Sequence, residues 1–299
     1  MNKEVLNRQI KEKARLIDIA LDNYLPTEET DPEIIHQAMR YSIFAGGKRL
    51  RPVLCLTAAE IVGSDVKLLS RAACAVELIH TYSLIHDDLP ALDNDDYRRG
   101  KLTNHKVYGD AIAILAGDAL LTRAFELIAE CGQDSSTPPH VVIRVIKEVA
   151  AAAGSMGMIG GQVVDIESEN KDIDKDTLTY IHSHKTGALF RASVRVGAML
   201  GGGTETQLSQ LTRYAESLGL AFQITDDVLD VEGDSAKLGK AVGSDERKNK
   251  NTYPARYGLS ESKQLARQTV EDAVSALQGF DDRADILRYI AVYLLERNE

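Results

Sequence analysis

Along most of the chain, apolar residues recur at steps of three and four positions. This spacing places them on one face of an α-helix, so the pattern predicts roughly ten or more amphipathic helices. No stretch shows a sustained alternation of apolar and polar residues bounded by hairpin turns, and a sheet therefore has no obvious source. We predict an all-α fold. The helical pattern covers residues 5–25, 33–45, 53–62, 72–86, 111–130, 140–156, 177–200, 211–231, 262–277 and 286–298.

The interruptions between these segments are short. Pro26, Pro32, the prolines at 138–139 and the glycines at 201–203 each mark the end or start of a helix. None of the interruptions is long enough, or biased enough in composition, to be a flexible linker between domains. We therefore expect residues 1–299 to form a single domain, built as one large helical bundle.

Composition narrows the classes of function. The formal net charge is -10 at pH 7, and an acidic chain repels nucleic acids and anionic lipids unless its basic residues are concentrated locally. The charged N-terminal segment lacks the apolar core of a signal peptide, and no apolar run approaches the ~20 residues of a membrane span. We expect a cytoplasmic protein that binds no nucleic acid and has no stable membrane anchor, with Cys55, Cys74 and Cys131 as reduced core residues.

The first of two acidic clusters holds Asp87, Asp88 and Asp93. The spacing from Asp87 to Asp93 does not keep both side chains on one face of a helix. Pro90 disfavours helical geometry at Leu89 and removes a backbone donor. We expect the helix to end or kink near Leu89, so that Asp93 folds back beside Asp87.

The second acidic cluster holds Asp226, Asp227 and Asp230. Asp226 and Asp230 are spaced i, i+4, which puts both carboxylates on one helix face about one turn apart. Oxygen ligands without Cys or converging His suit Mg²⁺, which is usually held by a few carboxylates together with substrate phosphates, and no calcium loop is present. One isolated aspartate pair is more often a solvated helix end, but two such clusters on apolar helices favour a metal site.

Basic residues gather in two places in this acidic chain. Lys48, Arg49 and Arg51 follow two glycines, and Arg98 and Arg99 follow the first acidic cluster. Arginine and lysine bind phosphate oxygens, and glycines allow a backbone to approach a bulky anion. A diphosphate held between Mg²⁺ and these cations would account for both kinds of charge. For Arg98 and Arg99 alone, ion pairs with the nearby aspartates are the alternative.

These motifs make the chain similar to the trans-isoprenyl diphosphate synthases, and within them to the bacterial short-chain branch that makes farnesyl diphosphate. The resemblance implies an all-helical fold around a deep central cavity, a homodimer, and two aspartate motifs that face each other across the cavity mouth. It spans nearly the whole chain through GGKRLRP, IHTYSLIHDDLPALDNDDYRRG, LAGDALL, GGQVVDIE, HKTGAL, FQITDDVLD, LGK and KNTYP.

The resemblance also implies a role for individual residues. The metal ligands, for Mg²⁺ ions that number three per site with substrate bound, would be Asp87, Asp88, Asp93, Asp226, Asp227 and Asp230. The cations that hold the allylic diphosphate would be Arg98, Lys185 and Lys240, with Lys250 as a helper. The residues that match the isopentenyl diphosphate site are Lys48, Arg51, His80 and Arg99, and Arg49 belongs to the same substrate-binding segment.

The implied reaction is head-to-tail prenyl transfer from dimethylallyl or geranyl diphosphate to isopentenyl diphosphate. Metal ions and cations stabilise the departing diphosphate, the C=C bond of isopentenyl diphosphate attacks the allylic cation, and the released diphosphate takes the proton. Gly187 weakens the helix after Lys185 and Thr186, and we expect a kink that aims freed carbonyls and the Thr186 hydroxyl at the cation. Gln223 precedes Asp226 by one turn and points the same way. The alternative for Thr186 and Gln223 is an ordinary polar residue packed in a helix.

Product length depends on the depth of the cavity. Tyr82 lies five residues before Asp87, which is about 7.5 Å down the helix. Tyr82 beside Ser83, with two extra residues inside the first motif, resembles the bacterial farnesyl branch, and we expect Tyr82 to form the cavity floor. A core tyrosine without this role, and a synthase of geranylgeranyl diphosphate, remain alternatives.

Two other readings of the sequence are open. Glu33 with His36, and Glu77 with His80, each form the Glu-x-x-His pattern that helical di-iron carboxylate proteins use. That reading leaves the clustered aspartates and cations unexplained. A catalytically silent subunit is the other, although such subunits usually have degraded aspartate motifs and both motifs are intact here.

Overall fold

The chain folds almost entirely into helices, as the hydrophobic pattern predicts. The computed structural model describes residues 3–64, 69–133, 137–232 and 251–296. The α-helices are α1 (Lys3–Tyr24), α2 (Glu33–Ile43), α3 (Leu50–Val62), α4 (Ser70–Asp87), α5 (Asn104–Tyr108), α6 (Asp110–Glu130), α7 (Pro139–Ala153), α8 (Met158–Glu167), α9 (Lys175–Ile181), α10 (Gly187–Leu200), α11 (Glu205–Glu232), α14 (Tyr253–Tyr257), α15 (Leu259–Ala276) and α16 (Asp285–Glu296). A π-helical segment η2 (His182–Thr186) joins α9 to α10, and a 3₁₀ turn η3 (Asp282–Ala284) precedes α16. The prediction of an all-α fold is confirmed.

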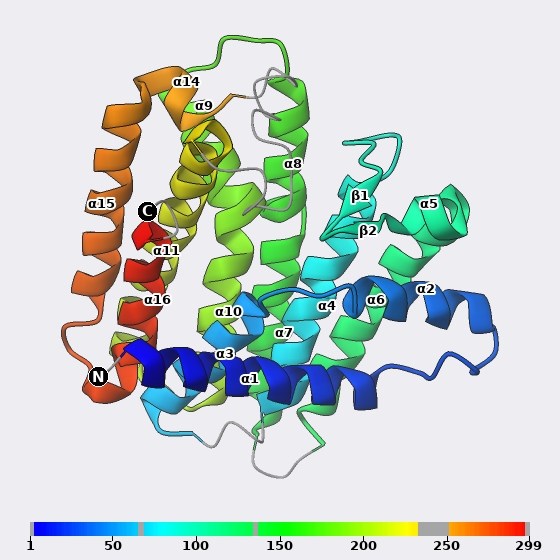
Figure 1. Cartoon of the computed structure of the whole chain (residues 1–299). Helices are drawn as coiled ribbons and strands as arrows, with labels where there is room; N and C mark the ends of the chain where they lie inside the picture. Colours follow the sequence, from blue (N-terminus) through cyan, green and yellow to red (C-terminus); the bar gives the residue numbers. More distant parts are fainter. Residues whose placement is uncertain (1–2, 65–68, 134–136, 233–250, 297–299) are drawn as a thin grey trace.

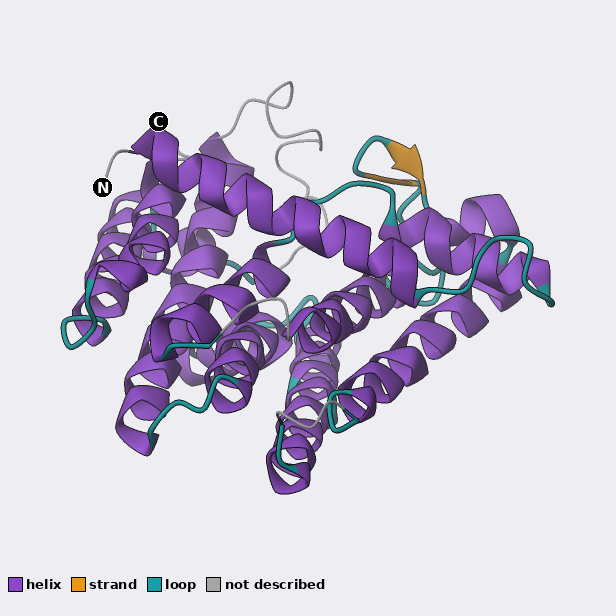
Figure 2. Cartoon of the chain, turned by 90° about the horizontal axis from the view of Figure 1, so that it is seen from below, coloured by secondary structure: helices purple, strands orange, loops and turns teal. Residues whose placement is uncertain are grey.

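The long helices stand side by side, and α1 lies across them (Figure 1). The view from below shows α1 spanning most of the width of the bundle (Figure 2). Helix α1 contacts α3, α4 and α16, so the first and last helices meet. The largest buried apolar cluster draws on helices from α1 to α16, which is the arrangement expected of one domain.

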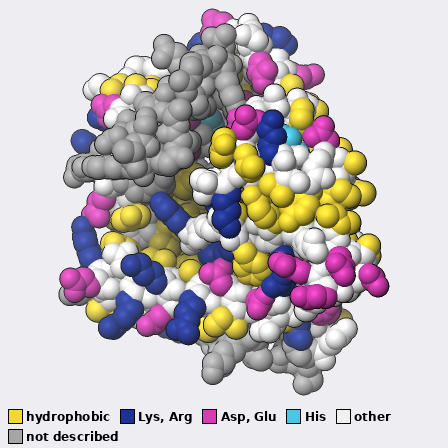
Figure 3. Space-filling view, turned by 45° about the vertical axis from the view of Figure 1, so that its right-hand side comes forward, with side chains coloured by type: hydrophobic (Ala, Val, Ile, Leu, Met, Phe, Trp, Pro, Cys, Tyr) yellow, Lys and Arg dark blue, Asp and Glu magenta, His cyan; other side chains and the backbone are white. Residues whose placement is uncertain are grey.

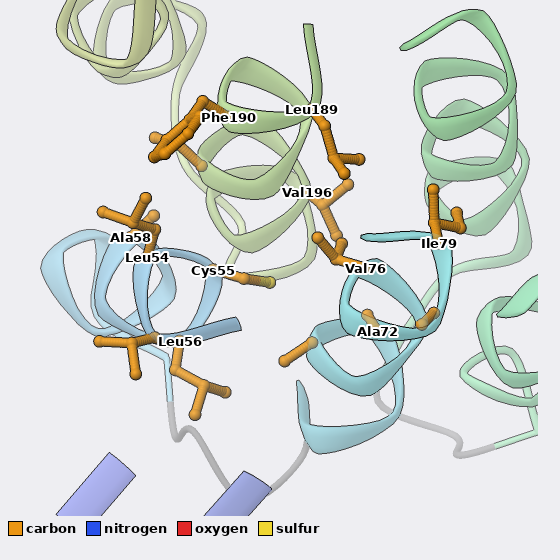
Figure 4. Close-up of a cluster of buried hydrophobic side chains, with 14 of the residues drawn as sticks. Leu54, Cys55, Leu56, Ala58, Ala72, Val76, Ile79, Leu189, Phe190 and Val196 are labelled. Carbon is orange, nitrogen blue, oxygen red and sulfur yellow. The ribbon is translucent and has the colours of Figure 1, made fainter. Parts of the chain in front are cut away.

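The centre of the core is formed by α3, α4 and α10 (Figure 4). Leu54 and Cys55 on α3, Val76 on α4 and Phe190 on α10 are fully buried there. Helices α3 and α10 meet closely at Gly197, where a Cβ atom would lie 1.9 Å from the carbonyl oxygen of Cys55. Any larger residue at this position would push the two helices apart. This packing fixes α10 and therefore the π-helical segment that precedes it.

A short hairpin is the one departure from the all-helical expectation within the described residues. β1 (Tyr97–Arg98) pairs antiparallel with β2 (Lys101–Leu102). The two turn residues, Arg99 and Gly100, have φ values of 53° and 76°, which are the paired positive angles of a type I′ turn. The hairpin is too short to show an alternating pattern, and the sequence therefore gave no signal for it.

Many apolar side chains of the helices are buried in the core. No helix among the described residues is long and apolar enough to span a membrane. Cys55, Cys74 and Cys131 are buried free thiols, as expected. Burial raises the pKa of the Cys55 thiol to about 12, which makes it an unreactive core residue.

Arg49 has a role different from the one expected of it. The residue is 4% exposed and was expected to bind substrate. Instead, Nε donates to Asp18 on α1 at 2.7 Å, Nη1 donates to buried Glu77 on α4 at 2.8 Å, and Nη2 donates to the carbonyl of Ile43 at the end of α2 at 2.6 Å. With these contacts Arg49 ties three helices together, and it is not placed to reach a ligand.

We predict that Arg49→Ala lowers the free energy of unfolding by about 3–5 kcal/mol, because the Glu77 carboxylate is left buried without its partner. Urea denaturation at neutral pH measures the change. The control is Arg191→Ala, which removes a surface ion pair to Glu216 at 3.5 Å and should cost less than about 1 kcal/mol. Equal effects of the two substitutions would contradict a structural role for Arg49.

Candidate active site

The π-helical segment η2 organises the site. It contacts α8, α9, α10 and α11. On α8, Gly161 allows a close approach, because a Cβ atom at this position would lie 2.1 Å from the backbone nitrogen of Lys185. A kink was expected beside Gly187, and the structure has the wider π turn immediately before it. The turn presents Lys185 toward α8 and Thr186 toward α11.

Lys185 lies between carboxylates from two helices. Its Nζ atom is 2.7 Å from Oδ2 of Asp165 on α8. Its charge also lowers the pKa of Asp87 on α4, against the larger effect of burial. Asp165 was not singled out from the sequence, although it lies inside the GGQVVDIE motif. Its role is set by a partner twenty positions away, which the sequence pattern alone cannot reveal.

The first acidic cluster forms as expected where α4 ends. Helix α4 stops at Asp87, and the backbone N–H of Asp93 donates to the carbonyl oxygen of Asp87 at 2.8 Å. Asp93 is thus folded back beside Asp87. Burial raises the pKa of Asp87 to about 6, and the neighbouring charges of Asp93 and Asp88 add to this rise. A cation bound here would relieve the crowding of negative charge.

Asp88 and Arg98 bind each other. Nε of Arg98 donates to both carboxylate oxygens of Asp88, at 2.9 and 2.8 Å, and Nη2 donates at 2.6 Å. Asp88 is buried, and burial raises its pKa although Arg98 opposes the rise. The ion pair considered as the alternative for Arg98 is therefore present. It holds the hairpin against the end of α4.

The second acidic cluster lies on α11 and connects to η2 through side chains. The Thr186 hydroxyl donates to Oε1 of Gln223 at 3.0 Å, and Nε2 of Gln223 donates to Oδ1 of Asp227 at 2.9 Å. Asp226 is half-buried, whereas Asp227 and Asp230 are buried. Thr186 and Gln223 are bonded to each other, and the expectation that both are directed at the allylic cation stays a prediction.

A group of basic side chains lies beside the first cluster. Nη1 of Arg51 is 3.3 Å from Nε2 of His80, and the Arg51 guanidinium lies over the Phe190 ring at 4.6 Å. Burial lowers the pKa of Arg51 to about 10; Glu77 opposes this shift and the charge of Arg99 adds to it. Burial and the surrounding arginines keep the pKa of His80 well below its ordinary value.

The hairpin turn brings Arg99 to the same place. Its guanidinium donates to the carbonyl of Gly46, and a Cβ atom at Gly47 would lie 2.7 Å from Nη1 of Arg99. Burial, followed among the lowering causes by the charges of Arg49 and Arg98, lowers the pKa of Arg99. Lys48 is exposed on the same loop. Mutually repelling cations at a partly covered surface are suited to bind an anion.

The face of the molecule in Figure 3 has basic side chains near a hollow. Basic side chains border the hollow left of the centre of the view, and apolar side chains lie within it. Lys240 and Lys250, expected to help bind diphosphate, lie outside the described residues. The depth of the central cavity stays a prediction.

Tyr82 and Ser83 lie on α4 before the first cluster. Tyr82 is 5% exposed and meets the ring of His86 edge-on at 5.6 Å. Burial raises its pKa to about 12, with further effects from Asp87 and from Asp118 on α6. The Ser83 hydroxyl donates to the carbonyl of His80 at 2.9 Å. Tyr82 is therefore buried beside His86, and Ser83 bonds to its own helix.

The residues of the di-iron alternative are engaged elsewhere. Glu77 binds Arg49, His80 binds Arg51, and His36 bonds to the backbone of Thr30. In the part of the chain that the structure describes, no three His, Cys, Asp or Glu side chains form a preassembled metal site. A di-iron centre would need such a group, because its ligands all come from the protein. A Mg²⁺ site would instead be completed by water and phosphate oxygens.

Comparison with known proteins decides the family. Residues 32–293 match the family model described as polyprenyl synthetase. The chain belongs to this family. It is 52% identical over 267 residues to the dimethylallyltranstransferase of Fischerella ambigua, covering 89% of this chain and 77% of that protein. It is 47% identical to the farnesyl diphosphate synthase of Geobacillus stearothermophilus, covering 97% of both chains.

Solved structures agree with this membership. The geranylgeranyl pyrophosphate synthetase of Pyrococcus horikoshii superposes with a TM-score of 0.89 at 36% identity, covering 98% of this chain and 99% of that one. The resemblance to the trans-isoprenyl diphosphate synthases is confirmed. The chain is a prenyltransferase that carries out prenyl chain elongation. Its relatives carry the names of both farnesyl and geranylgeranyl synthases.

We predict that Asp87→Asn stabilises the ligand-free polyprenyl synthetase at pH 7.5 by roughly 1–3 kcal/mol. The folded-state pKa of Asp87 is raised from 3.8 to about 6, so ionisation costs stability as pH rises through this window, at about 1.4 kcal/mol per pKa unit before solvent screening. Below about pH 4 the gain should vanish, because the carboxyl group is then protonated in both states.

Urea denaturation without divalent ions, at the two pH values, measures this gain. The control is Asp272→Asn on the exposed face of α15, which should change stability by less than about 0.5 kcal/mol. If Asp87→Asn were destabilising at pH 7.5, the crowding of charge at the end of α4 would be disproved.

Proposed function

We propose that the protein is a Mg²⁺-dependent farnesyl diphosphate synthase that condenses isopentenyl diphosphate with dimethylallyl or geranyl diphosphate. The observation that supports it best is the arrangement around Lys185. This cation pairs with Asp165, its charge lowers the pKa of Asp87, and the residue that follows it bonds toward the second acidic cluster. Clustered carboxylates therefore adjoin clustered cations at one place, which suits a metal-bound diphosphate.

The donor set fits Mg²⁺. Asp87, Asp93 and Asp226 would hold it, since these three carboxyl groups are half-buried at the ends of the two motifs. The raised pKa of Asp87 reflects burial and crowded negative charge that a divalent cation relieves. Bound there, Mg²⁺ neutralises the charge that accumulates on the departing diphosphate.

Separate sets of side chains bind the two diphosphate groups. Lys185 and Arg98 bind and orient the allylic diphosphate beside the carboxylates. Arg51, Arg99 and His80 bind isopentenyl diphosphate, whose negative charge offsets the mutual repulsion of the two arginines. Held in this way, the C=C bond of isopentenyl diphosphate faces the allylic carbon, and the released diphosphate takes the proton.

The fifteen-carbon product follows from Tyr82 in this proposal. A bulky buried ring about 7.5 Å before Asp87 on the same helix would stop the growing chain. Among the relatives, both farnesyl and geranylgeranyl synthases occur, so geranylgeranyl diphosphate is the second candidate product.

We also propose a cytoplasmic homodimer. Exposed apolar side chains occur on α6 and α8, and the right half of Figure 3 shows apolar side chains gathered on one face. Burying such a surface against a second copy would remove it from water. Sedimentation analysis of the purified protein tests the oligomeric state. The exposed residues are Ile114, Leu115, Ile159, Val163 and Ile166.

The purified protein should convert geranyl diphosphate and isopentenyl diphosphate to farnesyl diphosphate with Mg²⁺, and should lose turnover when EDTA is added. Asp226→Ala should lower kcat by about 10²-fold or more, since the metal-held charge on the leaving group is lost. Product sizing by chromatography and circular dichroism of the variant measure the two effects. Normal turnover of folded Asp226→Ala, or turnover in EDTA, would contradict the proposed metal.

Tyr82→Ala should shift the main product from fifteen to twenty carbons or more, because removing the buried ring opens space below Asp87. Tyr82→Phe keeps the ring and should leave the product at fifteen carbons. Mass spectrometry of the dephosphorylated alcohols distinguishes the two. An unchanged product in Tyr82→Ala would remove Tyr82 from the cavity floor, and a twenty-carbon product from the unmodified enzyme would favour the second candidate.

A further inference from the structure

Asp227 differs from Asp226 in its surroundings. Its side chain is almost fully covered, with the residue 2% exposed, whereas Asp226 is half-buried. Oδ1 accepts from Nε2 of Gln223 at 2.9 Å, and Oδ2 accepts from the backbone N–H of Tyr253 at 3.0 Å. Nε2 of His182, whose ring stacks on that of Tyr253, lies 3.8 Å from Oδ2. Both oxygens of Asp227 thus face protein groups.

These contacts fix the direction of the Gln223 amide. An ionised carboxylate only accepts hydrogen bonds, so Gln223 must turn Nε2 toward Asp227 and Oε1 away from it. Oε1 in turn only accepts, so the hydroxyl of Thr186 must donate its hydrogen to it, as it does at 3.0 Å. The lone pairs of the Thr186 oxygen then point away from Gln223.

We propose that Asp227 is a positioning residue rather than a metal ligand, and that it acts through Gln223 to present the lone pairs of Thr186 to the allylic cation. This inference rests on the proposed function and assigns roles within the second acidic motif. Hydrogen bonds that start from an ionised group are stronger than neutral ones and polarise the next bond in a chain. The negative charge of Asp227 is therefore felt at Thr186 without Asp227 touching substrate or metal.

Asp227→Asn makes a sharp test, because asparagine offers one acceptor and one donor. The fixed backbone N–H of Tyr253 takes the acceptor, so the new amide N–H₂ faces Gln223. Gln223 must then turn its amide over and place Nε2 against Thr186. The Thr186 oxygen would accept that hydrogen bond and turn its own hydrogen toward the cation, which is the unfavourable direction.

Three further variants test the chain without disturbing the contact to Tyr253. Gln223→Leu and Thr186→Val each remove one link, and Thr186→Ser keeps the hydroxyl. The matched controls come from α15, where Nε2 of Gln268 donates to Oδ1 of Asp272 at 3.2 Å with the same i, i+4 spacing on the exposed surface. Gln268→Leu and Asp272→Asn make the same chemical changes away from the site. Thermal unfolding checks that each variant is folded.

With geranyl diphosphate, Asp227→Asn, Gln223→Leu and Thr186→Val should each lower kcat by about 10–100-fold, the scale of losing one preorganised electrostatic contact. The KM for geranyl diphosphate should stay within about 3-fold of the unmodified enzyme, since the diphosphate contacts remain. The double variant Thr186→Val with Gln223→Leu should have a kcat no lower than that of the slower single variant, because both substitutions interrupt the same series of hydrogen bonds. Thr186→Ser should keep at least about a third of kcat, and the controls should be unchanged.

Calorimetry of Mg²⁺ with inorganic diphosphate separates positioning from ligation. Asp227→Asn should bind within about 3-fold of the unmodified protein, and Asp226→Asn should bind at least about 10-fold more weakly. Equal weakening of both variants, multiplying losses in the double variant, or slow controls would overturn the proposal. If the unmodified protein needed no Mg²⁺, the proposed metal dependence would be refuted. The kcat values of the variants would still test the series of hydrogen bonds from Asp227 to Thr186.

Discussion

The site depends on the close contact between α8 and the π turn η2. Gly161 leaves no side chain between the two backbones, and the turn widens the helix at His182–Thr186. Because of this geometry, Lys185 reaches the carboxylate of Asp165 on α8 while Thr186 reaches α11, and the charge of Lys185 acts on Asp87 of α4. In a regular helix, Lys185 and Thr186 would point 100° apart, and every later residue of α10 would change its position against α3. The π turn lets Lys185 and Thr186 reach α8 and α11 while α10 keeps its packing against α3.

Packing in the core stabilises the fold and offsets the unfavourable free energy of features at the site. Several unfavourable features of the described chain lie near the site: the crowded carboxyl of Asp87, the covered guanidinium of Arg51 and the positive φ of Arg99. Such features persist only where the surrounding structure holds them. Here the holding parts are the tightly packed helices α3, α4 and α10 and the buried Arg49, which joins α1, α2 and α4.

Sequence reasoning found the long helices, the end of α4 and the clusters of charge, because each has a local cause, but it missed the shorter helices α5, α8 and α14. Periodicity marks a helix, and Pro90 marks where it stops. The sequence alone could not distinguish Arg49 from its neighbours in GGKRLRP. The difference between a structural and a ligand-binding arginine lies in partners on distant helices. For the same reason Asp165 was missed, and Asp227 was grouped with Asp226. Tertiary contacts, which leave no periodic signal, decide these roles.

The arrangement of charge also bears on the order of binding. A divalent cation alone relieves the carboxylates of α4 but adds positive charge near Arg98 and Arg99. A diphosphate alone relieves the arginines but adds negative charge near Asp87. Only a metal–diphosphate pair offsets both at once, so each partner should strengthen the binding of the other by the same factor. Under the proposed function, the crowded charges would therefore favour a metal-bound diphosphate over either component, which is the form in which a leaving group can depart with its charge neutralised.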